Sequence, residues 1–600
     1  MSYHPPLRDM AFVLNDLLEA PARLSALSAH ADLDADLMKQ VLEEAGRFAA
    51  EVVAPLNVGG DREGCRFADG EVQTPGGFAN AYRQFCEAGW PALACATEYG
   101  GQGLPHLLNC ALFEMLSAAN HGWTMYPGLL HGAYACLSAH ASDELKALYL
   151  EKIVSGEWLA TMCLTEAHAG SDLGLLRTRA IRQDDESGSE SYRISGDKIF
   201  ISGGEQDMTT NIVHLVLARL PDAPAGSKGL SLFLVPKFLP DGARNEVRCT
   251  GTEHKMGIRG SATCSMHFDN AAGWLVGVEG RGLAAMFVMM NSARLHVGAQ
   301  GLGIAEAAYQ RALAYARERT QSRAPVRTST SNAADPIVMH PAVQKLLMTQ
   351  RCRIEGGRML AYWSGLLLDL AEHDVGGDNN ADQRRLHHDR LEFITPVIKA
   401  MLTDNGFQSA SQALQVFGGH GYVTETGIDQ YLRDARITMI YEGSNEIQAI
   451  DFLLRKTLAD GGRRMTDFLA MVELDVSQIA DDEFARQTQQ LLQLTRYLEK
   501  TTHAIAAASA TSPQLPYFVA EEMLRLTGHA AMAWLWLKAA RSAAQKHAAD
   551  PQFYGGKRDS ACYYFAFLFP EVHQLCGVID ACLAAGSPAI PSDLTLHDAA

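Results

Sequence analysis

The feature that most constrains the fold is a single block of short β-type segments enclosed by long helical ones. The segments 192–202, 212–220 and 230–236 are rich in β-branched residues or alternate polar and apolar residues, and turns containing Gly, Pro or Asp separate them. Apolar residues at helical spacing precede this block in 33–54 and return after it in 283–317. Because strands and helices do not alternate, a doubly wound dinucleotide-binding domain is disfavoured.

The predicted fold class is α+β, with four domains whose boundaries follow the changes between helical and β-type sequence patterns. We expect a leader and helical domain over 1–160, a middle β-barrel or sandwich over 161–280, a helical bundle over 281–456 and an additional helical domain over 457–600. The last domain contains the apolar run 532–537 and no catalytic motif. We expect it to pack on the core, and either to widen a subunit interface or to shape the entrance to the site.

Charge and cysteine usage disfavour several classes of protein. The net charge is −18 at pH 7 without any basic block, so a nucleic-acid partner is not expected. The 12 cysteines are scattered and form no C-x-x-C pair, which is typical of reduced thiols in a cytoplasmic protein and predicts no metal site. The first residues lack a basic region before an apolar core, and no apolar run reaches the roughly 18 residues of a membrane span. We therefore expect neither a secretory signal nor a transmembrane segment.

The segment Tyr441-Glu442-Gly443-Ser444 is the strongest local candidate for a site. It follows the apolar stretch 437–440, so Glu442 is a candidate desolvated base whose pKa burial would raise. Gly443 would let a substrate approach the backbone closely. The alternative is structural, because Ser444 before an apolar run is typical of a helix N-cap. The two interpretations are compatible.

Six separate motifs, in order, resemble those of the acyl-CoA dehydrogenase family of flavoenzymes. They are Cys163-Leu-Thr-Glu-Ala-His-Ala-Gly-Ser-Asp172, Lys198-Ile-Phe-Ile-Ser202, His254-Lys-Met-Gly-Ile-Arg-Gly-Ser261, Arg319 after the long helix, Gln415-Val-Phe-Gly-Gly-His-Gly421 and Tyr441-Glu-Gly-Ser444. The resemblance covers residues 30–456, and six motifs in order are specific where one alone is weak. The leader and the added C-terminal domain are similar to a long bacterial branch whose members differ in acyl preference. The resemblance therefore does not fix the substrate.

The resemblance implies α,β-desaturation of an acyl-CoA thioester, with FAD as cofactor and an electron-transferring flavoprotein as electron acceptor. Glu442 corresponds to the family's base, which takes the α-proton, and its backbone N–H would help to polarise the thioester carbonyl. An acyl-CoA oxidase that uses O₂ and a catalytically silent acyl-CoA-binding protein of the same fold stay open as alternatives.

The resemblance also assigns contacts to the cofactor and the substrate. The FAD contacts are Met162, Leu164, Thr165, Gly170, Ser171, Phe200, Ser202, Arg319, Gln415, Gly418, Gly419, Ser444 and Glu446. The substrate contacts are Ser171, Asn291, Arg294, Tyr441 and Gly443. Four of the FAD contacts, from Arg319 to Gly419, are expected to serve a neighbouring subunit, which implies a homodimer or homotetramer.

Three positions qualify these assignments. Phe200 and Ser202 stand where many relatives have Trp and Thr, and Asn291 replaces a common acidic residue. Phe keeps the aromatic face of Trp but loses its N–H donor, so we expect flavin binding to survive. For Arg294 the alternative is an arginine on the helix surface.

Overall fold

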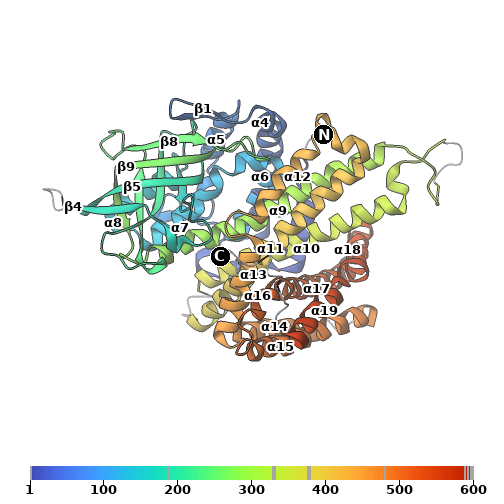
Figure 1. The fold of residues 1–600 in the computed structure, drawn as a ribbon. Coiled ribbons are helices and arrows are strands. Elements are labelled where there is room, and N and C mark those ends of the chain that lie inside the picture. Colours follow the sequence, from blue (N-terminus) through green and yellow to red (C-terminus); the bar gives the residue numbers. More distant parts are fainter. Residues whose placement is uncertain are drawn as a thin grey trace.

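The computed structural model describes residues 3–184, 190–327, 333–374, 380–478 and 482–586, together with Ile590 and Leu594. In Figure 1 the β domain lies to one side of a central bundle of long helices, and the C-terminal helices pack below that bundle. The predicted α+β class is confirmed. The order of helical, β and helical regions also agrees with the texture of the sequence.

The N-terminal region is helical and is centred on one buried helix. Its elements are α1 (Leu7–Ala11), α2 (Ala20–Ser25), α3 (Ala35–Phe48), α4 (Asn57–Glu63), the hairpin of β1 (Arg66–Ala68) and β2 (Glu71–Gln73), α5 (Phe78–Glu87), α6 (His106–Thr124), α7 (Leu130–His140) and α8 (Asp143–Val154). Helix α6 is buried over almost its whole length because it is apolar on every face.

The middle domain is a mixed sheet that closes on itself. Its strands are β3 (Trp158–Cys163), β4 (Arg179–Asp184), β5 (Glu190–Ser202), β6 (Asn211–Arg219), β7 (Leu230–Pro236), β8 (Val247–Thr252) and β9 (Thr263–Val276). Strand β6 pairs in parallel with β3 and β4 and antiparallel with β7. The pairs β4–β5, β5–β9 and β7–β9 complete the ring, so the sheet is barrel-like.

Long helices form the central bundle. They are α9 (Gly282–Glu318), α10 (Pro341–Glu372) and α11 (Ala381–Phe417), followed by the short α12 (Asp429–Arg436), α13 (Asn445–Ile450) and the π-helical turn η14 (Asp451–Thr457). Glycines let these helices approach closely. A Cβ at Gly301 of α9 would lie 2.6 Å from the carbonyl oxygen of Leu402 in α11, and one at Gly303 would lie 2.5 Å from that of Glu114 in α6.

The C-terminal domain packs on the bundle, as the sequence predicts. Its helices are α14 (Arg463–Ser477), α15 (Ala485–Ala508), α16 (Leu515–Phe518), α17 (Ala520–Lys546), α18 (Pro551–Tyr563) and α19 (Glu571–Ala585). Trp534 of α17 meets Trp363 of α10 edge to face, with ring centroids 5.1 Å apart. Residues 587–589, 591–593 and 595–600 of the predicted domain lie outside the described residues.

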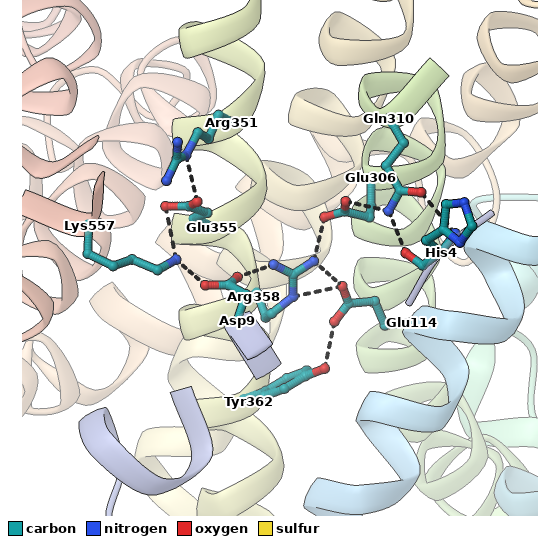
Figure 2. A network of polar contacts seen from close by, with 10 residues as sticks. All are labelled: His4, Asp9, Glu114, Glu306, Gln310, Arg351, Glu355, Arg358, Tyr362 and Lys557. Atoms are coloured by element: carbon teal, nitrogen blue, oxygen red, sulfur yellow. Dashed lines mark hydrogen bonds and ion pairs between the residues drawn. The ribbon is translucent and has the colours of Figure 1, made fainter. Parts of the chain in front are cut away.

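A buried polar network fastens the two ends of the chain to the bundle (Figure 2). Arg358 of α10 donates to Glu114 of α6 at 2.6 and 2.9 Å and to Glu306 of α9 at 2.7 Å. It also pairs with Asp9 of α1, which in turn pairs with Lys557 of α18. The leader, the bundle and the C-terminal domain therefore share one set of charges.

One stretch of the described chain, Pro551–Ala585, is long and apolar enough to cross a membrane by length and composition alone. It comprises α18, a π-helical turn and α19, and Pro570 stands before α19. A single stretch of this kind is weak evidence, so the expected absence of a transmembrane segment stays a prediction.

Candidate active site

The predicted base and several predicted flavin contacts meet at one cavity. The cavity has a volume of about 60 Å³ and lies between the N-terminal helices, the β domain and the bundle. Its lining residues are Met125, Gly128, Leu129, Met162, Phe200, Ser202, Ala293, His296, Val297, Gln300, Tyr441 and Glu442. The fold thus brings together Met162, Phe200 and Ser202 from the β domain with Tyr441 and Glu442 from the loop before α13.

Glu442 has a backbone conformation that is rare for a residue with a side chain. Its φ is +55° and that of Gly443 is +82°, both in the left-handed region. Gln448 of α13 donates to the carbonyl oxygens of both residues, at 3.1 and 3.4 Å. Such strain costs about 1–3 kcal/mol and persists only where the surroundings enforce it. The surroundings therefore hold this loop in one conformation.

Ser444 caps α13, as the structural interpretation of this segment predicts. Its hydroxyl oxygen accepts a hydrogen bond from the N–H of Ile447 at 3.4 Å. Glu446, in the first turn of the helix, is exposed, and its pKa is lowered mainly by hydrogen bonding to Ser444. The cap fixes the helix start directly after Glu442, so a cap and a base coexist in one segment.

The Glu442 carboxyl occupies an unusual electrostatic position. Its removal from water raises its pKa to about 7, and the positive charges of Arg294 and Lys399 limit the rise. Within the described ranges, no hydrogen bond or ion pair reaches this carboxylate. A carboxyl with a pKa close to neutrality and no committed partner is suited to proton transfer.

Arg294 is buried, so the alternative of a helix-surface arginine is wrong. Only 6% of the residue is exposed, and its guanidinium lies 3.4 Å from a carboxylate oxygen of Asp451. It also donates to the side-chain oxygen of the exposed Asn291 at 3.5 Å. Arg294 is therefore paired with Asp451 and still lowers the pKa of Glu442.

Phe200 contributes an aromatic side chain to the lining of the same cavity. It lies in an irregular part of β5, where the register with β9 shifts between Lys198 and Ile201, and its φ is +60°. The residue is 58% exposed although its side chain is apolar. An exposed ring beside Ser202 and Met162 fits the face of a planar cofactor.

A buried ion pair fixes the predicted flavin-edge residues beside the same strand. Lys198 donates to Glu166 at 2.9 Å and to the carbonyl oxygen of Leu164 at 3.0 Å. The next N–H of β5 donates to the carbonyl oxygen of Thr165 at 2.9 Å. Burial alone would raise the pKa of Glu166, but Lys198 and hydrogen bonds to the carboxylate bring it down to about 2. Leu164 and Thr165 are thus held close to Phe200.

The remaining predicted contacts do not line this cavity. Gly170 and Ser171 are exposed in the turn that follows Thr165. A second group lies where α9 and α11 end, and it consists of Arg319, Gln415, Gly418 and Gly419. About two thirds of the length of α9 separates Arg319 from Arg294, which is about 37 Å at a rise of 1.5 Å per residue.

Sequence reasoning missed three side chains that hold the loop of the base, namely Gln300, Lys399 and the Gln448 described above. The Tyr441 hydroxyl donates to Gln300 of α9. Lys399 of α11 donates to the carbonyl oxygen of Gly443 at 2.8 Å. For Lys399 the sequence carried a signal, because it is the single charge in the run 393–402.

Within the described residues, a carboxylate without a direct partner and an exposed aromatic residue line one cavity, in a fold with a β domain between helical ones; this arrangement fits a flavin-dependent dehydrogenase. Family models describe four successive parts of the chain. They are the N-terminal domain of acyl-CoA dehydrogenase at 36–157, its middle domain at 161–271, its C-terminal domain at 280–455 and an acetyl-CoA dehydrogenase C-terminal-like domain at 463–584. The chain belongs to the acyl-CoA dehydrogenase family, whose members are FAD-dependent oxidoreductases.

Relatives match nearly the whole chain. The 3-methylmercaptopropionyl-CoA dehydrogenase of Ruegeria pomeroyi is 43% identical over 541 residues, which are 89% of this chain and 90% of that protein. A butyryl-CoA dehydrogenase of Syntrophomonas wolfei is 34% identical over 611 residues, 98% of each chain. An acyl-CoA dehydrogenase from Bacillus anthracis, solved with FAD, superposes with a TM-score of 0.72 at 19% identity, over 93% of this chain and 89% of that one. The predicted family and cofactor are confirmed.

Proposed function

We propose that the protein desaturates a short acyl-CoA thioester between its α- and β-carbons, giving the trans-2-enoyl-CoA. The observation that carries this proposal is the position of Glu442. Among the described residues its carboxyl has no hydrogen-bond or ion-pair partner, and Glu442 lines a small cavity together with Phe200. A base for an α-proton needs such a place, because strong cationic pairing would weaken it as a proton acceptor.

The chain supplies both the base and a donor for the developing negative charge. The Glu442 carboxylate takes the α-proton, and its backbone N–H donates to the thioester oxygen. In the described part of the chain this N–H makes no hydrogen bond, so it is available to a ligand. A donor aimed at a developing oxyanion is typically worth a few kcal/mol of barrier. FAD, when bound, accepts the hydride equivalent from the β-carbon.

The residues around the cavity fit a flavin ring. Phe200 offers an exposed aromatic surface, Met162 a polarisable one and Ser202 a hydroxyl. We propose that Thr165, held by β5, meets the edge of the ring. An electron-transferring flavoprotein is proposed as the acceptor that reoxidises the enzyme, on the ground of the family resemblance.

Bulky side chains close the walls of the cavity, whose volume is about 60 Å³. The Tyr441–Gln300 hydrogen bond closes one wall, and His296, stacked on Phe113 with centroids 4.6 Å apart, closes another. Both relatives described above are named for short acyl groups, so we propose butyryl-CoA or 3-methylmercaptopropionyl-CoA as the substrate class.

We propose that the working enzyme is a homo-oligomer. Arg319 lies at the C-terminal end of α9, and Gln415, Gly418 and Gly419 lie at that of α11, far from the cavity. A Cβ built at Gly418 or Gly419 meets no atom within 4 Å, so a phosphate could approach the backbone there. The guanidinium of Arg319 suits the same ligand. These residues are proposed to hold the FAD of a second subunit.

Anaerobic mixing of the FAD-loaded protein with butyryl-, octanoyl-, palmitoyl- and 3-methylmercaptopropionyl-CoA tests the proposal. Loss of the visible flavin absorbance with the two short substrates, and a slower loss with the long ones, is expected. A yellow protein that none of them bleaches would overturn the proposal in favour of a silent acyl-CoA binder. Stoichiometric peroxide in aerated turnover would favour the oxidase alternative.

A further inference from the structure

Lys399 is a buried lysine that has no carboxylate partner among the residues that the structure describes. It lies in the middle of α11 and is completely buried. Its ammonium donates to the carbonyl oxygen of Gly443 at 2.8 Å and to the side-chain oxygen of Asn445 at 3.0 Å. Among the described residues it forms no ion pair. A buried charge that only neutral groups satisfy is costly, so its retention calls for a reason.

The acceptors of Lys399 belong to the loop that carries the proposed base. Gly443 follows Glu442 directly, and Asn445 opens α13. Asn445 is itself held to α11, since it accepts from the Thr403 hydroxyl at 3.2 Å and donates to the carbonyl oxygen of Ala400 at 3.2 Å. Four hydrogen bonds therefore join helix α11 to this loop. One runs from the Lys399 ammonium to the Gly443 carbonyl, and the other three involve the side chain of Asn445.

We propose that Lys399 is a positioning residue for the base. It holds Glu442 and Gly443 in their left-handed turn and supplies the positive charge that favours the ionised carboxylate. This inference rests on the proposed function of Glu442. Lys399 is not assigned any contact with the substrate or the flavin.

The two cations near Glu442 differ in what else they neutralise. Arg294 of α9 faces Asp451 of η14 at 3.4 Å, whereas Lys399 meets neutral acceptors only. The charged groups around Lys399 are Glu442 and Glu446, which favour its protonated form, and Arg294, which opposes it. Arg294 lowers the pKa of Glu442 more than Lys399 does, but in the described part of the chain Lys399 is the cation that has no carboxylate partner of its own.

The direction of the pH effect follows from these signs. Burial lowers the pKa of Lys399 to about 7, and the charge of Glu442 raises it. Lys399 in turn lowers the pKa of Glu442. Removing the Lys399 charge therefore raises the pKa of Glu442 further, and flavin reduction, which needs the ionised carboxylate, begins at higher pH.

The test measures anaerobic flavin reduction by butyryl-CoA and 3-methylmercaptopropionyl-CoA from about pH 6 to about pH 9.5, in the full-length FAD-loaded enzyme. Lys399→Met removes the charge and both donors. It is expected to slow flavin reduction about 10²-fold, the effect of a small misplacement of a catalytic group. It should also move the rising limb of the pH–rate profile, where the rate constant of flavin reduction increases with pH, to higher pH. Lys399→Arg keeps the charge, so its limb stays in place.

Two further variants separate the effect of the hydrogen bonds that hold the loop from the effect of the positive charge. Gln448→Leu removes the other donor to the Glu442 and Gly443 carbonyls and leaves every charge unchanged. It is expected to lower the rate without moving the limb. Lys399→Gln keeps an N–H donor group without the positive charge. It should move the rising part of the pH–rate profile to higher pH, with a smaller loss of the rate of flavin reduction than in Lys399→Met. The Gln variant carries the test even if the Met variant does not fold.

Lys456→Met is the matched control, because it removes a lysine of η14 that pairs with Glu392 away from the cavity. It should behave as the wild type. Lys399→Gln with an unshifted limb, or Lys399→Met with a wild-type rate, would overturn the inference. These results differ from failure of the proposed function, in which the wild type itself is not reduced by either thioester.

Discussion

Two buried clusters of charge in this protein are built in opposite ways. Around Arg358, carboxylates from three distant segments meet the guanidinium in direct contacts (Figure 2). Around Glu442, the nearest cations reach other partners, and the carboxylate has no direct contact within the described residues. In the first cluster the charges pair directly with one another. In the second, the Glu442 carboxylate pairs directly with no other described residue.

The pKa values express this difference. Burial would raise the pKa of Asp9, but Lys557 and Arg358 bring it below its ordinary value. Burial raises the pKa of Glu442 to about 7, since Arg294 and Lys399 only limit the rise. Paired buried charges thus hold segments together, whereas an unpaired one stays reactive at a cost in stability.

The largest expected effect is a loss of the rate of flavin reduction when the Glu442 carboxylate is removed. Glu442→Gln keeps the size of the side chain and cannot accept the α-proton. We expect flavin reduction by butyryl-CoA to slow about 10²–10⁴-fold, the usual contribution of a general base. Stopped-flow absorbance under anaerobic conditions measures it, and an unchanged FAD content serves as the control. A rate within a factor of a few of the wild type would remove Glu442 from the role of base.

The next largest effect is a loss of thermal stability when the ion-pair network around Arg358 is broken. Arg358→Leu leaves Glu114, Glu306 and Asp9 buried without their shared cation, which typically costs about 3–5 kcal/mol. We expect the first thermal transition of the FAD-loaded protein to fall markedly. Arg463→Leu is the matched control, because Arg463 is about half exposed and such surface pairs contribute about 0–1 kcal/mol. Equal shifts for the two variants would contradict a stabilising role of the network.

A smaller effect is expected at the aromatic wall of the cavity. Phe200→Ala removes the exposed ring that we propose packs on the flavin. An aromatic contact is worth about 0.5–1.5 kcal/mol beyond its area, so the dissociation constant of FAD should rise about 2- to 10-fold. Fluorescence titration of the apoprotein with FAD measures this. Tighter binding in the variant would show that the ring opposes the cofactor instead.

The smallest effect concerns stability and sharpens the contrast between the clusters. Since the pKa of Glu442 is raised from 4.5 in the unfolded chain to about 7 in the folded protein, stability is lost as pH rises from about 4.5 to about 7 and stays at the lower value above that. Glu442→Gln should therefore raise the melting temperature relative to the wild type more at about pH 8 than at about pH 4.5. A stabilisation that does not depend on pH would contradict the sign of this linkage.

Much of the fold was readable because each helix and strand carries its own periodicity. The segment 283–317 predicts a helix, and α9 spans Gly282–Glu318. The segment 192–202 predicts a strand, and β5 ends at Ser202. Closure of the sheet was not readable in detail, since the pairing of β6 with β3, β4 and β7 depends on segments far apart in the sequence.

The site was readable only in part, for a physical reason. The position of Glu442 follows from local sequence, whereas its partners come from helices 40 to 150 residues away. No local pattern reveals that Lys399 meets the Gly443 carbonyl or that Arg294 meets Asp451. The left-handed φ of Phe200 was equally hidden, because a regular strand with Phe inward fits the same residues.

The pH dependence of anaerobic flavin reduction by butyryl-CoA or 3-methylmercaptopropionyl-CoA tests the central claim most directly. If the half-buried Glu442, which pairs with no described residue, is the base, the rate constant rises with pH through an apparent pKa near 7, and Glu442→Gln abolishes that rise. A wild-type rate that is constant across this range, or a Glu442→Gln variant with the same pH profile, would contradict the account.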